Sequence, residues 1–155
     1  MDVRYINPLI VSMSKIFTEL TGINIIRDKL FIRKDPIFLD NVAIMIGVTG
    51  EIRGQLAISM EKSTALNVAS KMMMGMSVSE FDEMAKSAIG EMGNMIAGTY
   101  ATSLSDLDKR VDITPPSILS GENINYSSYY GEQLTITFKS DIGDISMDVS
   151  IKENN

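Results

Sequence analysis

The sequence predicts an α+β fold, with a mostly antiparallel β-sheet and two long helices packed on it. The prediction depends on three observations: the elements run as helix, strands, helices and strands; two pairs of strand-like runs are joined by short turns; and the helical segments are amphipathic. No linker-like or low-complexity stretch divides the chain, so residues 1–155 are expected to form a single domain. At 155 residues, such a domain can bury a sizeable hydrophobic core.

The N-terminal segment predicts a helix followed by a strand. Asn7 followed by Pro8 is typical of an N-cap and the first helical position. Apolar residues then recur at three- and four-residue steps as far as Leu20, and Gly22 favours a C-terminal stop. Residues 23–33 are rich in β-branched side chains and predict the first strand.

Two β-hairpins are predicted from paired strand-like runs. Residues 42–48 and 52–58 flank a Thr-Gly-Glu turn, and the first run is almost wholly apolar, which indicates a central strand. Residues 134–138 and 145–151 alternate apolar with polar side chains, which is typical of strands that are buried on one face only. This second pair is expected to close the sheet.

The middle of the chain predicts two helices. The first covers residues 61–74 and ends at Gly75. The second begins at a capping box formed by Ser77 and Glu80 and continues to about Leu104. Five of the 12 methionines are expected to fill the core near the junction of these helices: Met72, Met73, Met74, Met76 and Met84. A surface for a partner is the alternative for the run from Met72 to Met76.

The segment between the second of these helices and the last hairpin predicts a strand and a loop. Residues 108–113 begin a strand that is interrupted at Pro115 and Pro116, because proline cannot donate to a strand ladder. Residues 121–131 are polar and contain tyrosines, and they predict a loop.

The composition excludes several classes of enzyme and partner. The chain has no Cys and no His, which excludes cysteine and histidine phosphatases, Ser–His hydrolases and zinc sites built on these ligands. A net charge of −6 argues against nucleic acid, whose phosphates would be repelled, and favours a partner with a basic face. The N-terminus does not resemble a signal peptide and no run of about 20 apolar residues is present. A cytoplasmic protein without a membrane segment is expected.

The second central helix carries polar side chains on one narrow strip. At about 100° per residue, Glu91 lies about 40° to one side of Ser87, and Asn94 lies about 20° to the other. Gly98 falls on the same strip. The residues expected to face the core lie nearly opposite: Phe81, Ala85, Ile89, Met92, Ile96 and Tyr100. Glu and Asn on such a face are ordinarily solvated, so their spacing alone does not establish a function.

Three glycines near this strip need an explanation, because each costs about 1 kcal/mol relative to Ala in an exposed helix. Gly90 and Gly93 lie on a flank of the strip. Close packing on the sheet and close approach of another protein's backbone account for them equally well. Gly98 lies on the polar strip itself, which favours docking of a partner.

The segment Ser87-Ala88-Ile89-Gly90-Glu91-Met92-Gly93-Asn94 resembles the active-site helix of the CheC/CheX/FliY chemotaxis phosphatases. The family's pattern is an acidic residue or Ser, then Glu, then Asn at this spacing, with a proline farther along the chain. Pro115 and Pro116 are both candidates for that proline. The resemblance covers nearly the whole chain. CheC-type members carry the motif twice and FliY-type members add a further domain, so a single motif in 155 residues is similar to the CheX type.

The resemblance implies a phosphatase that removes the aspartyl phosphate of a phosphorylated, CheY-like response-regulator receiver. It implies that Asn94 orients the attacking water and that Glu91 pairs with the receiver's active-site Lys. Ser87, Gly98 and Pro116 are expected to contact the partner. No cofactor or metal is expected on this chain, because Mg²⁺ belongs to the receiver. The resemblance also implies a homodimer whose subunits join through their sheets.

Two other classes of function remain open at this point. A non-catalytic adaptor would use the same helix face to bind receivers in chemotaxis signalling without hastening phosphate loss. A regulatory dimer that binds a small molecule would need an enclosed pocket between the helices and the sheet. A metal-dependent hydrolase has little support, because no Asp/Glu cluster has convincing ligand spacing.

Overall fold

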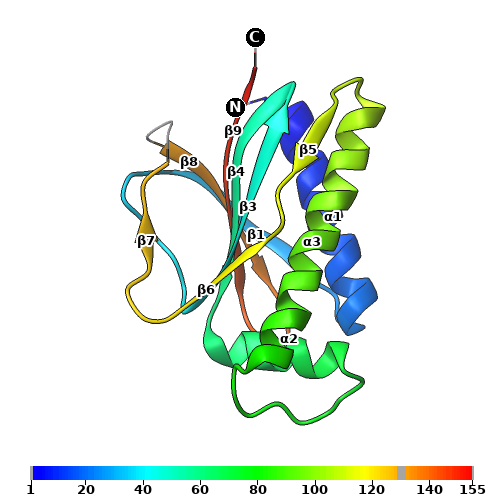
Figure 1. The fold of residues 1–155 in the computed structure, drawn as a ribbon, viewed down its shortest axis with the longest axis vertical. Helices are drawn as coiled ribbons and strands as arrows, with labels where there is room; N and C mark the ends of the chain where they lie inside the picture. Colours follow the sequence, from blue (N-terminus) through cyan, green and yellow to red (C-terminus); the bar gives the residue numbers. More distant parts are fainter. Residues whose placement is uncertain (1, 129–131, 155) are drawn as a thin grey trace.

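The computed structural model describes residues 2–128 and 132–154. These residues form three helices and nine strands (Figure 1). In chain order the elements are α1 (Val3–Thr21), β1 (Ile26–Lys34), β2 (Ile37–Phe38), β3 (Val42–Gly50), β4 (Ile52–Met60), α2 (Lys62–Met72), α3 (Glu83–Asp106), β5 (Val111–Ile113), β6 (Ser117–Ser120), β7 (Asn125–Tyr126), β8 (Glu132–Lys139) and β9 (Ile145–Glu153).

Seven of these strands form one antiparallel sheet. Its order is β1-β8-β9-β4-β3, and both β5 and β6 pair with β3 at the far edge. The two predicted hairpins are confirmed as β3–β4, in which Ile44 pairs with Ile58, and as β8–β9, in which Leu134 pairs with Val149. The predicted α+β fold with a mostly antiparallel sheet is therefore confirmed.

The helices cover one face of the sheet, with α1 and α3 side by side along the strands and α2 near one end (Figure 1). Alternate residues of the central strands point toward the helices, as the period of a strand requires. Their apolar side chains form the core together with the buried helix faces: Val42, Ile44, Ile46, Val48, Leu56, Ile58, Leu134, Ile136, Met147 and Val149. This packing makes the sheet a rigid support for α3.

The opposite face of the sheet, here called the polar face, is unusual because its polar side chains are buried. Gln133, Thr135, Asp148 and Ser150 are each at most 2% exposed. The short ribbon β2–β7 lies on this side, and the hydroxyl of Tyr126 donates to Oε1 of Gln133. Residues expected to form the outer, solvated side of a closing hairpin are therefore largely covered.

Arg33 joins three parts of the polar face. Its Nη2 donates to Oδ1 of Asp148 at 2.8 Å, its Nε donates to Oγ1 of Thr135 at 2.9 Å, and its Nη1 donates to the carbonyl oxygen of Phe38 at 3.1 Å. The Asp148 side chain is 0% exposed, so the ion pair has one fully buried member. Arg33 thereby ties the connection between β1 and β2 onto the sheet.

The starts predicted for two helices are wrong. α1 begins at Val3, where Oδ1 of Asp2 accepts from the backbone N–H of Arg4 at 2.9 Å, and Pro8 lies inside the helix. The earlier start buries two further residues, Tyr5 and Ile6, in the core. α3 begins at Glu83 rather than at the predicted capping box, because Oδ1 of Asp82 accepts from the N–H of Ala85 at 2.9 Å. Asp serves as an N-cap as well as Ser does.

The core-filling role predicted for the five methionines near the junction of α2 and α3 is wrong for three of them. Met74 is 97% exposed, Met76 is 59% exposed and Met84 is 61% exposed. Met74 and the following Gly75 adopt positive φ angles of 59° and 84°, which turn the chain outward after α2. The connection therefore leaves the core before its methionines can enter it.

Candidate partner-docking site on helix α3

The inner face of α3 is anchored in the core, as the angular pattern predicts. Ala85, Ile89, Met92, Ile96 and Tyr100 are 0% exposed. The sixth residue predicted for this face, Phe81, precedes the helix and is only partly buried.

Tyr100 also fixes α3 to α1, because its hydroxyl donates to the backbone carbonyl of Tyr5 at 2.7 Å. Burial raises the pKa of Tyr100, so the hydroxyl keeps the proton that it donates. The outer face of α3 is thus presented on a backbone whose position is fixed.

The outer strip of α3 is exposed as predicted. Ser87, Glu91 and Asn94 are exposed, and Gly98 is partly exposed. Within residues 2–128 and 132–154, neither the carboxylate of Glu91 nor the amide of Asn94 has a hydrogen-bond or ion-pair partner. On the same helix, the exposed carboxylate of Glu83 is paired with Lys86 at 3.4 Å. Glu91 and Asn94 are therefore free to bind groups of another molecule.

The helix glycines divide into two kinds. A Cβ at Gly93 would lie 2.7 Å from Cγ2 of Ile44, and a Cβ at Gly90 would lie 3.7 Å from Cδ1 of Ile118. Gly93 therefore lets α3 pack closely on β3, and Gly90 contacts β6. A Cβ at Gly98 would meet nothing within 4 Å. Packing inside this chain accounts for Gly93 but gives no reason for Gly98.

Pro116 lies outside the strip, in the segment that connects β5 and β6 beside α3 (Figure 1). Just before the prolines, Thr114 bridges to β3: its N–H donates to the carbonyl of Gly47 at 2.9 Å, and its Oγ1 accepts from the N–H of Gly47 at 2.8 Å. Pro115 is exposed and Pro116 is partly buried. The structure thus brings Ser87, Glu91, Asn94 and Gly98 onto one surface, with Pro116 on a neighbouring segment.

The strip is an open helix surface, and the chemistry available on it is that of a carboxylate, an amide and a hydroxyl. In the part of the chain that the structure describes, no three His, Cys, Asp or Glu side chains are grouped so that they could hold a metal ion. None of the helices in those ranges is both long and apolar enough to cross a membrane. A pair of groups of this kind can position a partner and a water molecule.

Comparison with known proteins decides the family. A sequence model described as "Chemotaxis phosphatase CheX" matches residues 42–139, a range that contains all of α3. The chain belongs to the CheX family of chemotaxis phosphatases. A protein of Thermotoga maritima named "CheY-P phosphatase CheX" is 41% identical to this CheX-family protein over 129 residues, which are 83% of each chain.

Solved structures agree with this assignment. A CheC-like superfamily protein from Shewanella sp. PV-4 superposes with a TM-score of 0.89 at 26% identity, over 98% of this chain and 99% of the other. A chain in the CheX–CheY–BeF3–Mg²⁺ complex from Borrelia burgdorferi superposes with a TM-score of 0.81 at 30% identity, over 96% of this chain and 98% of the other. The CheC/CheX-like fold is therefore established.

One further group of polar residues was missed by sequence reasoning. Arg53 and Gln55 on β4 line a cavity on the polar face, together with Ser128 and with Ser150 on β9. Their alternation with apolar residues was visible in the sequence, but it indicated only a solvated strand face. The short β2–β7 ribbon, which lies over this side of the sheet, gave no signal of its own.

Proposed function

We propose that this CheX-family protein removes the aspartyl phosphate of a CheY-like receiver by completing the receiver's own active site. The observation that carries the proposal is the exposed and unpartnered pair Glu91 and Asn94, one helical turn apart on α3. The T. maritima relative is named for activity on CheY-P, and the B. burgdorferi relative was solved in complex with CheY. Both names support a receiver as the partner.

Asn94 orients the attacking water in this proposal. Phosphoryl transfer passes through a loose transition state, so catalysis depends on alignment and charge stabilisation rather than on removal of a proton. A carboxamide offers one acceptor and two donor hydrogens, and it does not titrate. It can therefore hold a water molecule in line with the phosphorus across the whole physiological pH range.

Glu91 sets the register of docking by pairing with the receiver's active-site Lys. We do not assign it as a general base, because a loose transition state demands little deprotonation of the water. Mg²⁺ is supplied by the receiver, where it stabilises charge on the phosphoryl group. Ser87, Gly98 and Pro116 contact the partner around the pair, and Gly98 leaves room for its backbone.

Glu91→Ala is expected to weaken binding of the receiver by about tenfold, because a charge-assisted contact is lost, and to slow phosphate loss at subsaturating receiver. Titration calorimetry with a beryllofluoride-loaded receiver measures the binding. Glu19→Ala removes the same charge from an exposed position on α1 and is the matched control. Equal affinities for the two variants would contradict the docking role. Tight receiver binding by the unmodified protein without faster phosphate loss would favour the adaptor function instead.

We also propose that the single domain forms a homodimer through the free edge of β1. In the described part of the chain this edge strand pairs only with β8, and Ile26, Leu30, Phe31 and Ile32 are 41–71% exposed. A nine-residue edge strand with exposed apolar side chains is prone to pair with another strand. Such a strand is stabilised when a second copy covers it.

Ile32→Lys is expected to convert the dimer to a monomer, because a charged side chain on an edge strand opposes strand addition. Light scattering coupled to size exclusion measures the mass. Val11→Lys, at a position on α1 that is 63% exposed, is the control and should remain dimeric. A monomeric unmodified protein, or a dimer that tolerates Ile32→Lys, would contradict the proposed interface.

A further inference from the structure

The polar face contains buried side chains whose hydrogen-bonding groups are unsatisfied. Within the described residues, no partner is found for Oγ of Ser128, Nε2 of Gln133, Oδ2 of Asp148 or Oγ of Ser150. Gln133 and Ser150 are at most 2% exposed, and Ser128 is 9% exposed. A buried polar group without a partner costs about 1–3 kcal/mol, so a cluster of such groups needs an explanation.

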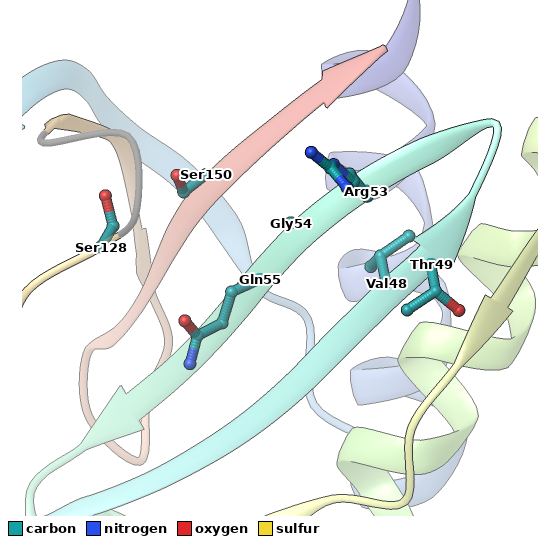
Figure 2. A pocket seen from close by; sticks show the side chains of 7 residues that line it. All are labelled: Val48, Thr49, Arg53, Gly54, Gln55, Ser128 and Ser150. Atoms are coloured by element: carbon teal, nitrogen blue, oxygen red, sulfur yellow. The ribbon is translucent and has the colours of Figure 1, made fainter. Parts of the chain in front are cut away.

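Two of these groups line a cavity of about 450 Å³ on the polar face (Figure 2). The hydroxyls of Ser128 and Ser150 lie along it with the side chains of Arg53 and Gln55, and Val48 and Thr49 complete the lining. Gln55 is the direct cross-strand neighbour of Ser150, so an amide and a buried hydroxyl stand side by side. The volume falls in the range of pockets that hold small molecules, which is about 300–1,000 Å³.

Gly54 shapes the same wall. A Cβ at this position would lie 1.8 Å from the carbonyl oxygen of Ser150, and the φ angle of Gly54 is +151°. β4 and β9 can therefore approach each other here only because position 54 has no side chain. The close approach brings Arg53, Gln55 and Ser150 to one wall of the cavity.

Among the described residues that line this cavity, Arg53 carries the charge, in a protein with a net charge of −6. No acidic side chain lines the cavity, and Arg53 forms no ion pair with any residue in the described ranges. An anion in the cavity would pair with this guanidinium.

We propose that this cavity binds a small organic anion that carries a carboxylate or a phosphate group. Arg53 supplies the charge and a two-pronged donor for the anionic group. The amide of Gln55 and the hydroxyls of Ser128 and Ser150 bind polar atoms of the ligand. A concave site with buried hydroxyls favours a small ligand over a second copy of this chain, whose apolar contact surface lies on β1. The site lies across the sheet from α3 and is independent of the proposed phosphatase function.

The proposal is tested by titrating the full-length, ¹⁵N-labelled protein with inorganic phosphate, succinate and citrate at constant ionic strength. Saturable shifts of the backbone amides of Gly54, Gln55 and Ser150 are expected with at least one probe. The probe that binds distinguishes phosphate from carboxylate recognition. The absence of saturable shifts with all three probes overturns the proposal. Shifts that depend on protein concentration rather than on the anion also overturn it, because they indicate a second copy at this face.

Three variants test whether the anion binds at this site. Arg53→Gln keeps an exposed polar side chain and is expected to weaken anion binding at least about tenfold, because a charged donor is lost. Arg27→Gln removes the same charge from an exposed position near the other end of the sheet and should leave the affinity unchanged. Equal affinities for the two variants overturn the assignment. Ser150→Ala removes a hydroxyl that has no partner among the described residues, so weaker binding with an unchanged unfolding midpoint is expected for it.

Discussion

Replacing Asn94 with alanine is expected to slow the accelerated loss of phosphate by about 10²-fold or more while leaving receiver binding nearly unchanged. Removal of one group that positions or stabilises a reacting centre has an effect of this size. Asn94 is exposed and makes no contact that the fold needs, and alanine is the better helix former, so stability should be equal or slightly higher. A separation of rate from binding and from stability is the signature of a group that acts on the water.

The measurement is a single-turnover assay of phosphate loss from a phosphorylated receiver at saturating concentrations of the protein. Asn67→Ala is the matched control, because Asn67 is an exposed asparagine on another helix, α2. It should retain the full rate. If Asn94→Ala also retains the full rate with its fold intact, the water-orienting role is wrong, and the acceleration must come from Glu91 or from a rearrangement of the receiver.

Replacing Arg33 with methionine is expected to lower the free energy of unfolding by about 3–5 kcal/mol. The change leaves the fully buried carboxylate of Asp148 without its cation, and an uncompensated buried charge has a cost of this size. It also releases the carbonyl of Phe38 and with it the β1–β2 connection. Urea titration followed by circular dichroism measures the change.

The double variant Arg33→Met, Asp148→Asn separates charge from packing. An amide at position 148 carries no charge and can still accept from Thr135, so much of the lost stability should return. Arg27→Met, at an exposed position on the same strand, should change stability by no more than about 0.5 kcal/mol. A double variant as unstable as Arg33→Met would mean that the arginine stabilises the fold through its contact with Phe38 rather than through the ion pair.

Local patterns predicted the elements that carry the candidate site. The strip of Ser87, Glu91 and Asn94 follows from helical geometry alone, and the two hairpins follow from alternation and turn residues. The helix starts were less predictable, because Asp2 and Asp82 compete with other good caps and burial of distant residues decides between them. The roles of Glu91 and Asn94 remain predictions, because exposed polar side chains on a helix are ordinarily solvated without having a function.

The burial of polar side chains on the polar face depends on long-range contacts, which the sequence does not reveal. Gln133 and Asp148 alternate with apolar residues, which predicts side chains in water, yet both are buried. Their burial depends on short segments around Ile37 and Tyr126 that pair with each other across the polar face. Neither segment is long enough to produce a periodic pattern, and the second lies in a range predicted as a loop.

The two edges of the sheet differ, and the difference limits how copies of this protein can associate. The β3 side ends in two short strands separated by Pro115 and Pro116, which lack the N–H groups that an incoming strand would need. Among the described residues, the other edge of this sheet is β1, a nine-residue strand whose pairing with β8 shifts register between Arg27 and Leu30. Antiparallel pairing of β1 with β1 of a second copy uses the same edge of each molecule and closes under two-fold symmetry. In the proposed homodimer, the prolines at the β3 side would oppose addition of a further strand there, so assembly would stop at two copies instead of continuing into a filament.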